Sequence, residues 1–345
     1  MYSVNMHLHV LWSMTVVVIL AGVGGGSVMA GATTEPSEVW IRPSGGADAM
    51  PLWGVRGGMM VGLAPMPGPR GLIRIYTPYL GQPAGRVMNF IAVEPVVKGV
   101  RCLSELEKSH LDGKAGLKMW SADAVDLEHP PVDTAIPSRG VADGATLSVY
   151  VCVEPFLNGA HVVVKITFHS DRPHEVCLST FAAGDSKPME ACVLTATMGN
   201  FARLRHLHLR DRTIEAGELF RGAAVNSMGF FDWHEWPASE MRDSGLPRSD
   251  GEIFVSATGD LDDAIAAAEV PRGWRYVGRP AVQSWRIAAS RDARVRVNGR
   301  RTFWATNAEI PGGAAFENFE IYEPFIAGEI FRFGVEAESD ISSIR

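Results

Sequence analysis

Residues 147–169 read Leu147-Ser-Val-Tyr-Val-Cys-Val-Glu-Pro-Phe-Leu-Asn-Gly-Ala-His-Val-Val-Val-Lys-Ile-Thr-Phe-His169, and this stretch decides the fold. In its first half, apolar residues from Leu147 to Val153 alternate with more polar ones, as in a half-buried strand. In its second half, every second residue from Val162 to Phe168 is apolar, which defines one face of another strand. Asn158-Gly159 lies between the halves and is the strongest short-range hairpin signal. The stretch therefore predicts an antiparallel β-hairpin.

The same pattern recurs along most of the chain in short segments that turn residues separate. Further candidate strands are residues 71–76, 88–97, 175–181, 192–197, 203–209, 252–257, 294–297, 314–322 and 329–335. The turns between them are rich in Gly, Pro, Asn and Asp, for example Asn298-Gly299 and Pro311-Gly312-Gly313. Many short strands of this kind indicate a sandwich or a barrel. We predict an all-β chain, a large antiparallel β-sandwich with long loops.

Helical signals are sparse. Residues 260–269 combine acidic residues in the first turn with an alanine-rich body, which predicts one short helix. Residues 104–110 predict a further helical turn. We therefore expect one or two short helices.

The domain organisation follows from the same patterns. We expect a signal peptide over residues 1–32, an N-terminal extension over 33–70 and the β-sandwich domain over 71–345. Residues 121–145 and 221–250 resemble long loops, and loops of this length are often functional. They leave open a division of the chain into two β domains.

The composition excludes several classes of function. The chain has 345 residues, 46% of them hydrophobic and 21% charged, with a formal net charge of −7. A negative balance argues against general nucleic-acid binding. Past the N-terminus, no window is apolar enough to span a membrane, so we expect no span after signal removal.

The N-terminus has the pattern of a secretory signal. An apolar run extends over residues 10–23, then come Gly24-Gly25-Gly26 and the small-residue site Val28-Met29-Ala30. No Lys or Arg precedes the run, which departs from the usual pattern. The pattern predicts a secreted or periplasmic protein, and a buried or disordered apolar N-terminus is the alternative.

Four cysteines remain after this segment. An even number in an exported chain permits two disulfides in three pairings. However, two of them lie inside apolar strand-like runs, where free Cys behaves as a small buried hydrophobe. We expect buried thiols, or one bridge at most, among Cys102, Cys152, Cys177 and Cys192.

The most unusual candidate strand is Arg203-Leu-Arg-His-Leu-His-Leu-Arg210. With a side-chain period of two, both of its faces carry charge. Guanidinium groups bind carboxylates, and imidazoles move protons near neutral pH, so the strand suits an anionic sugar chain. An edge strand with solvated charges is the alternative. The candidate site residues here are Asn200, Arg203, Arg205, His206, His208 and Arg210.

His206 and His208 also have the spacing of two metal ligands on one strand. A complete site needs a third ligand, for which Glu235, His234, His169 and His174 are available. The chain has no His-Glu-x-x-His motif, so we expect neither a metal nor a cofactor.

A second candidate region is Phe230-Phe-Asp-Trp-His-Glu-Trp236. Trp233 and Trp236 flank a His-Glu pair, and aromatic rings stack on the apolar faces of sugars. His234 and Glu235 are candidates for acid–base work. The alternative is a loop that its aromatic residues anchor in the core.

A third feature is a pair of carboxylates in apolar strands. Glu317 and Glu94 each lie among apolar residues, where an unpaired charge is costly, so we expect an Arg partner or a raised pKa. Paired carboxylates across a cleft suit glycoside hydrolysis. A structural salt bridge is the alternative for each.

Four runs resemble those of a family of secreted bacterial β-rich proteins without an established activity, and the likeness covers most of the mature chain. They are Gly68-Pro-Arg-Gly-Leu-Ile-Arg-Ile-Tyr76, Asn89-Phe-Ile-Ala-Val-Glu-Pro95, Thr197-Met-Gly-Asn-Phe-Ala-Arg-Leu-Arg205 and Pro311-Gly-Gly-Ala-Ala-Phe-Glu-Asn-Phe-Glu320. The size and strand count are similar to the galactose-mutarotase-like supersandwich of sugar epimerases and polysaccharide lyases. This likeness concerns the fold alone and brings no catalytic residues.

Together these features predict a secreted carbohydrate-active protein whose partner is a polysaccharide or oligosaccharide. In a lyase, Arg203 or Arg205 neutralises a uronate and His206 or His208 takes the proton. In a glycosidase, carboxylates such as Glu317 act instead. The alternatives are a non-catalytic glycan-binding or cell-surface module and a metal-dependent enzyme.

Overall fold

In a computed structural model of the chain, the predicted hairpin consists of β9 (Thr146–Val153) and β10 (Val162–His169). The two strands are antiparallel, with Ile166 opposite Val149. Gly159 in the connecting turn has a φ of 88°, which glycine adopts without strain. Every apolar residue of the predicted inner faces is buried, as the alternation requires.

The structure describes residues 39–46, 48–77, 87–132, 134, 136–197, 204–243, 251–259, 281–288, 292–303 and 307–337. Contacts divide the chain into the units Met1–Glu35 and Pro36–Arg345, and every described residue belongs to the second.

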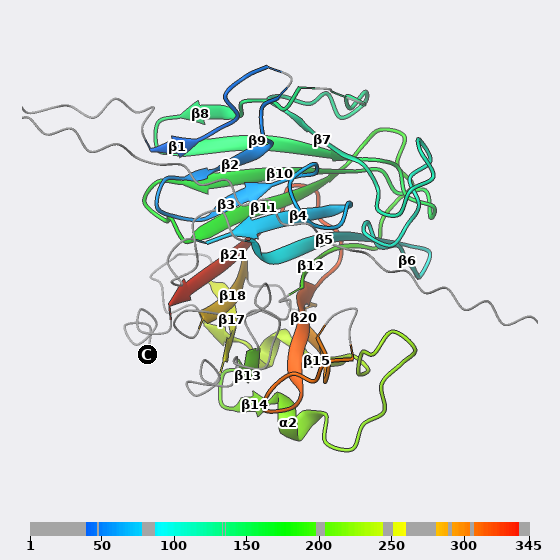
Figure 1. Cartoon of the computed structure of the whole chain (residues 1–345), viewed down its shortest axis with the longest axis vertical. Coiled ribbons are helices and arrows are strands. Elements are labelled where there is room, and N and C mark those ends of the chain that lie inside the picture. Colours follow the sequence, from blue (N-terminus) through cyan, green and yellow to red (C-terminus); the bar gives the residue numbers. More distant parts are fainter. Residues whose placement is uncertain are drawn as a thin grey trace, which may run out of the picture. The chain divides into compact units, whose positions relative to one another are not determined.

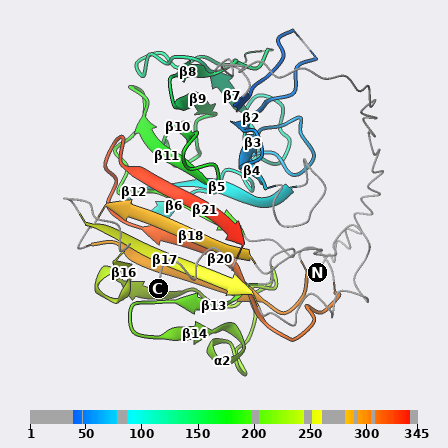
Figure 2. The ribbon, with the colours of Figure 1, turned by 90° about the vertical axis from the view of Figure 1, so that its left-hand side faces the viewer.

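The strands form one hydrogen-bonded antiparallel sheet that folds into two layers, which β13 and β20 join, and we call these layers the first and the second sheet (Figures 1 and 2). The first sheet contains, in order across it, β1 (Trp40–Ile41), β2 (Leu52–Val55), β3 (Met60–Gly62), β4 (Leu72–Tyr76), β5 (Val87–Val97), β12 (Ala191–Thr197), β20 (Ala315–Tyr322), β19 (Arg294–Arg300) and β15 (His234–Pro237), with β6 (Val100–Arg101) beside one end of β5. The second contains β7 (Met119–Ala122) and β8 (Val141–Asp143), both paired with β9, then β10, β11 (Glu175–Ala182), β21 (Ile330–Ala337), β18 (Ala281–Ala288), β17 (Glu252–Gly259), β13 (Leu204–His208) and β14 (Thr213–Glu215), with β16 (Arg242–Asp243) beside β17.

The sheets face each other across one continuous apolar core, so the predicted all-β sandwich is confirmed. Alternate residues of both sheets fill this core, which includes the fully buried rings of Trp53, Trp285 and Phe333. A polar contact crosses the core, because Asn89 Nδ2 donates to Gln283 Oε1 at 2.7 Å. At one end the sheets also meet edge to edge through the pair Leu204–Phe316.

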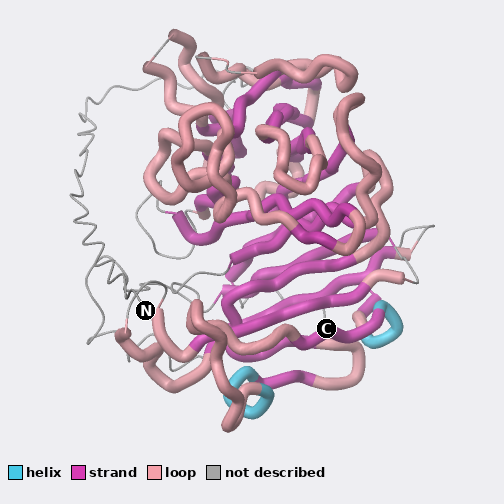
Figure 3. The backbone as a smooth tube through the Cα atoms, turned by 90° about the vertical axis from the view of Figure 1, so that its right-hand side faces the viewer, coloured by secondary structure: helices cyan, strands magenta, loops and turns pink. Residues whose placement is uncertain are grey.

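Helices are few among the described residues (Figure 3). They are the single turn α2 (Ala216–Leu219) and the 3₁₀ turn η2 (Ala238–Glu240). Residues 104–110 form hydrogen-bonded turns rather than a helix, with Glu107 N donating to Leu103 O. The helix predicted over 260–269 lies outside the described residues.

Several strands lie where the sequence pattern predicts none. Strands β1 to β3 continue the first sheet within residues 33–70, and β15 lies in the stretch 221–250. Asn298-Gly299 was expected to form a turn, and this expectation is wrong. A register shift at this point forms a bulge, and β19 continues to Arg300.

All four cysteines are free and buried. Burial raises the pKa of the Cys152 thiol to about 11 and that of Cys192 to about 12. In the part of the chain that the structure describes, no helix has both the length and the apolar character needed to cross a membrane.

Candidate functional site

A row of polar side chains runs across the outer face of the first sheet. Core residues such as Phe319 and Val295 point inward, so Glu320 on β20 and Arg296 on β19 point outward. Thr195 on β12 and Glu235 on β15 extend the row on either side, because they bond to Glu320 and Arg296 respectively. We call this surface the polar face.

Arg101 joins this row to a second carboxylate. Its Nη1 and Nη2 lie 2.9 and 2.6 Å from the two oxygens of Glu320, and its Nε lies 2.5 Å from Glu94 Oε2. Glu320 also accepts from Thr195 Oγ1 at 2.7 Å and from Arg296 Nη1 at 3.1 Å. Glu320 is fully buried, and these bonds hold it at the centre of the polar face.

Glu94 has fewer partners and a raised pKa. Burial raises the pKa of its carboxyl to about 8; Arg101 opposes the shift, and the nearby carboxylates of Glu105 and Glu320 add to it. Burial also raises the pKa of Glu105 to about 7, and no hydrogen-bond partner reaches its Oε2 among the described residues. Burial therefore favours the protonated form of two carboxyl groups beside the polar face, Glu94 and Glu105.

Aromatic rings border these charges. The guanidinium groups of Arg101 and Arg296 lie 5.5 and 5.0 Å from the centre of the Trp233 ring, and Arg296 also lies 5.4 Å from the Tyr322 ring. Such contacts fix the cations by cation–π attraction. Trp233, Tyr322 and both arginines are half-buried, so part of each surface faces solvent.

Towards the other end of the strands, the polar face carries uncharged groups. Thr197 on β12 lies opposite Asn318 on β20, which lies opposite Asn298 on β19. Phe90 on β5 lies opposite Thr197. Asn298 is 4% exposed, and its Oδ1 has no hydrogen-bond partner in the described part of the chain. An orphaned acceptor at this depth is unusual in a folded protein.

The residues of the predicted aromatic region divide between the two sides of the sheet. Trp233 and Glu235 belong to the polar face, and Glu235 pairs with Arg294 at 2.7 Å and with Arg296 at 3.5 Å. His234 and Trp236 stack on each other toward the core side, where His234 also meets the edge of Phe220. The two pairs therefore do not form one acid–base group.

The Arg/His strand lies in the other sheet. Leu207 of β13 is in the core, so His206 and His208 project from the outer face of the second sheet. Both ring nitrogens of His208 contact hydroxyl groups, Thr258 Oγ1 at 2.8 Å and Thr213 Oγ1 at 3.2 Å. These contacts leave His208 poorly placed as a metal ligand.

The described arginines of this segment donate hydrogen bonds to backbone carbonyl groups. Arg205 is 5% exposed and donates to the carbonyl oxygens of Pro311, Gly313 and Ala314. Arg210 donates to Met241 O at 3.1 Å. Asn200 and Arg203 lie outside the described residues.

Glu317 lies in the bulge between β19 and β20. It is 2% exposed, and burial raises its pKa to about 7 against the opposing charge of Arg300. Its Oε1 has no hydrogen-bond partner in the described residues. We expected an Arg partner or a raised pKa for each carboxylate: Glu94 pairs with Arg101, and burial raises the pKa of both Glu94 and Glu317.

The sequence argument missed the centre of the polar face, which consists of Arg101, Thr195, Arg296 and Glu320. The alternation in residues 315–322 does place Glu320 opposite to Phe319. The sequence does not show that β20 pairs with β12, or that the β5–β6 hairpin places Arg101 over Glu94.

Among the described residues, no group of three or more His, Cys, Asp and Glu side chains is arranged to hold a metal ion. No protein-family model matches the chain, and no curated protein matches its sequence. The functional argument therefore depends on the geometry of the polar face.

Proposed function

We propose that the chain is a secreted carbohydrate-active protein that binds an oligosaccharide or polysaccharide on the polar face. The observation that carries the proposal is the buried carboxyl of Glu94, held by Arg101 beside half-exposed Trp233 and Tyr322 on one sheet surface. Aromatic rings can stack on sugar rings, and the amides of Asn298 and Asn318 suit sugar hydroxyl groups.

The chemistry that this arrangement suits is hydrolysis of a glycosidic bond. Burial raises the pKa of Glu94 to about 8, which favours a protonated carboxyl that can protonate the oxygen of a leaving group. Glu235 is exposed and is paired with arginines, so its carboxylate is the candidate base or nucleophile. Elimination from a uronate has less support, because His206 and His208 project from the other sheet.

Glu94 has to be reached by the substrate. Its side chain is 4% exposed, and Arg101, which is 20% exposed, covers it. Nη2 of Arg101 contacts both carboxylates, whereas Nη1 bonds to Glu320 and not to Glu94. A guanidinium group that leaves Glu94 can therefore remain bonded to Glu320 through Nη1. We therefore assign Arg101 as the residue that positions Glu94 and uncovers it when a sugar binds.

Activity on a panel of neutral and uronic-acid polysaccharides tests this proposal. Reducing-end release reports hydrolysis, and the absorbance of unsaturated products reports elimination. We expect Glu94→Gln to lower kcat/KM by about 100-fold or more, and Glu218→Gln on the exposed surface of α2 to leave it unchanged. Turnover that Glu94→Gln leaves intact contradicts the role of Glu94.

A non-catalytic glycan-binding module is the second candidate, and the burial of both Glu94 and Glu320 favours it. It predicts that Trp233→Ala abolishes retention on a polysaccharide column while the wild-type protein shows no turnover on any substrate. Turnover in the first assay excludes this candidate.

Export is a separate part of the proposal and rests on the apolar run and small-residue site within residues 1–32. Fractionation of cells that express the full chain, with the mass of the mature protein, tests it. We expect cleavage near Ala30 or Ala32. A full-length product that stays in the cytoplasmic fraction contradicts export.

A further inference from the structure

Lysine and exposed apolar side chains gather on three neighbouring loops at one edge of the molecule. The chain has six lysines, and four of them fall within residues 98–118. The loops are the β5–β6 turn, the segment between β6 and β7, and the β9–β10 turn; β6 itself and the β11–β12 loop, which carries Lys187, lie beside them. We call the set the Lys/Leu surface, and its members are Lys98, Val100, Leu106, Lys108, Leu111, Lys114, Leu157 and Lys187.

Hydrogen bonds hold the three loops together. Asn158 Nδ2 donates to Val100 O at 3.0 Å, which joins the β9–β10 turn to β6. The Leu157 amide donates to Glu107 Oε2 at 3.0 Å, which joins the same turn to the segment after β6. Lys187 N donates to Gly159 O at 2.9 Å, so the last lysine lies against this turn as well.

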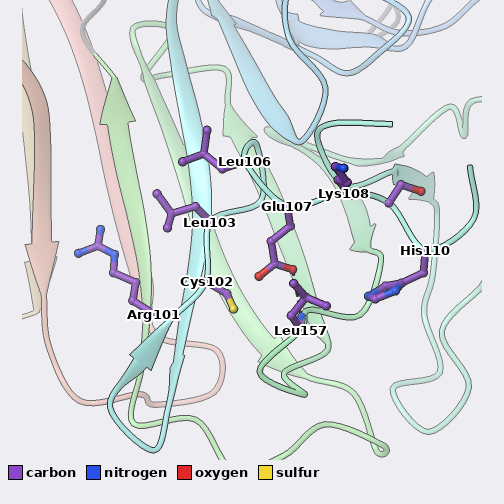
Figure 4. Close-up of a pocket in the computed structure, with 9 residues that line it drawn as sticks. Arg101, Cys102, Leu103, Leu106, Glu107, Lys108, His110 and Leu157 are labelled. Atoms are coloured by element: carbon purple, nitrogen blue, oxygen red, sulfur yellow. Dashed lines mark hydrogen bonds between the residues drawn. The ribbon is translucent and has the colours of Figure 1, made fainter. Parts of the chain in front are cut away.

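The apolar side chains of this surface face solvent. Val100, Leu106, Leu111 and Leu157 are 56%, 54%, 56% and 67% exposed. A shallow depression of about 560 Å³ lies between Leu106 and Leu157, with Lys108 and His110 on its border (Figure 4). Contiguous exposed apolar side chains mark interaction sites.

The charge of this surface opposes that of the whole chain. The formal net charge is −7, yet four lysines surround the exposed leucines, and no ion pair is found for Lys98, Lys108 or Lys187 among the described residues. Over residues 98–118, five basic residues outnumber three acidic ones, which gives this segment a formal net charge of +2. The basic residues are Lys98, Arg101, Lys108, Lys114 and Lys118, and the acidic ones are Glu105, Glu107 and Asp112. The surface is therefore locally cationic.

We propose that the Lys/Leu surface docks the protein on an anionic lipid bilayer. Leucines at loop tips insert into the headgroup region, and the surrounding lysines extend to the phosphate groups. Lysines near a negatively charged leaflet strengthen such binding additively and in a salt-dependent manner. Apolar side chains that project from three loops suit a bilayer surface better than a single peptide groove.

Exposed apolar residues elsewhere lack this setting. Val132 and Ile136 are 64% and 54% exposed, and the segment that carries them, residues 121–145, contains no lysine. They supply a matched control of the same side-chain type and exposure. Arg101 of the polar face also lines the depression, but the substitutions that test the proposal change no residue of that face.

Co-flotation of the full chain with lipid vesicles tests the proposal. The vesicles contain phosphatidylcholine alone or with about one third phosphatidylglycerol, at low and high NaCl. We expect binding to the anionic vesicles, and we expect salt to weaken it. Loss of three lysines in Lys98→Gln/Lys108→Gln/Lys187→Gln should lower the partition coefficient about 100-fold, at about fivefold per lysine.

Two further variants separate insertion from charge. Leu106→Ser/Leu157→Ser should lose binding, while Val132→Ser/Ile136→Ser keeps it, with circular dichroism to confirm that both fold. Three results overturn the proposal: no binding to anionic vesicles, equal loss in the control variant, or binding to a soluble acidic polysaccharide with none to vesicles.

Discussion

Glu317 makes the stability of the protein depend on pH in a way that a single substitution isolates. Its carboxyl is 2% exposed in the β19–β20 bulge, and burial raises its pKa from 4.5 to about 7. The folded protein therefore binds a proton that the unfolded chain has lost between pH 4.5 and 7. Stability contributed by this site falls as the pH rises through that window, and the loss is complete above it.

The magnitude follows from the shift. One pKa unit corresponds to about 1.4 kcal/mol. The reference is a carboxyl that stays protonated in both the folded and the unfolded protein. Compared with it, ionisation of Glu317 lowers the free energy of unfolding by about 1 kcal/mol at pH 5 and by about 3 kcal/mol at pH 8. Glu317→Gln removes the titration. The difference in stability between the variant and the wild type should therefore shift by about 2 kcal/mol in favour of the variant from pH 5 to pH 8.

Urea unfolding followed by tryptophan fluorescence at pH 5, 6, 7 and 8 measures this difference. The comparison cancels the contributions of Glu94 and Glu105, which change stability with pH in the same direction. Glu218→Gln on α2 serves as a control with an exposed carboxyl. A difference between Glu317→Gln and wild type that stays constant within about 0.5 kcal/mol from pH 5 to pH 8 refutes the reasoning.

Three further outcomes are expected. Asn89→Ala leaves the buried Gln283 amide without its partner and should lower the free energy of unfolding by about 2 kcal/mol. The double variant Asn89→Leu/Gln283→Leu should recover part of this lost stability. Equal losses of stability in the two variants contradict the pairing. Arg205→Ala should lower Tm, because three carbonyl oxygens lose their donor, and a Tm unchanged within error argues against that role. Native protein should react slowly with a thiol reagent and unfolded protein should show four thiols, with no effect of reductant on Tm; fewer than four contradicts Cys102, Cys152, Cys177 and Cys192 as free thiols.

Alternation of apolar residues predicts the fold well wherever one face of a strand is buried and the other is polar. The hairpin of residues 147–169 has the predicted strands and the predicted turn. The pattern fails for β18 and for β2, whose residues are buried on both faces, because continuous burial removes the alternation. It fails again at Asn298-Gly299, where the residues typical of a turn form a bulge.

The candidate site is harder to predict than the fold because it depends on pairing between distant strands. Glu94 and Trp233 attract notice in the sequence, but Arg101 and Glu320 meet only across 219 positions of the chain. The prediction for the Arg/His strand depended on the sequence in a similar way. The sequence shows that Arg205 carries a charge, but only the fold shows that its guanidinium group donates to backbone carbonyl groups.

The two strands nearest the carboxyl-terminal end of the described chain, β20 and β21, lie in the interior of the two sheets. β20 joins β12 to β19, and β21 joins β11 to β18. Until a ribosome has released these strands, neither layer can close, and the edges of β11 and β12 stay open to wrong partners. A polypeptide with this topology cannot complete either layer until both of these late strands are available.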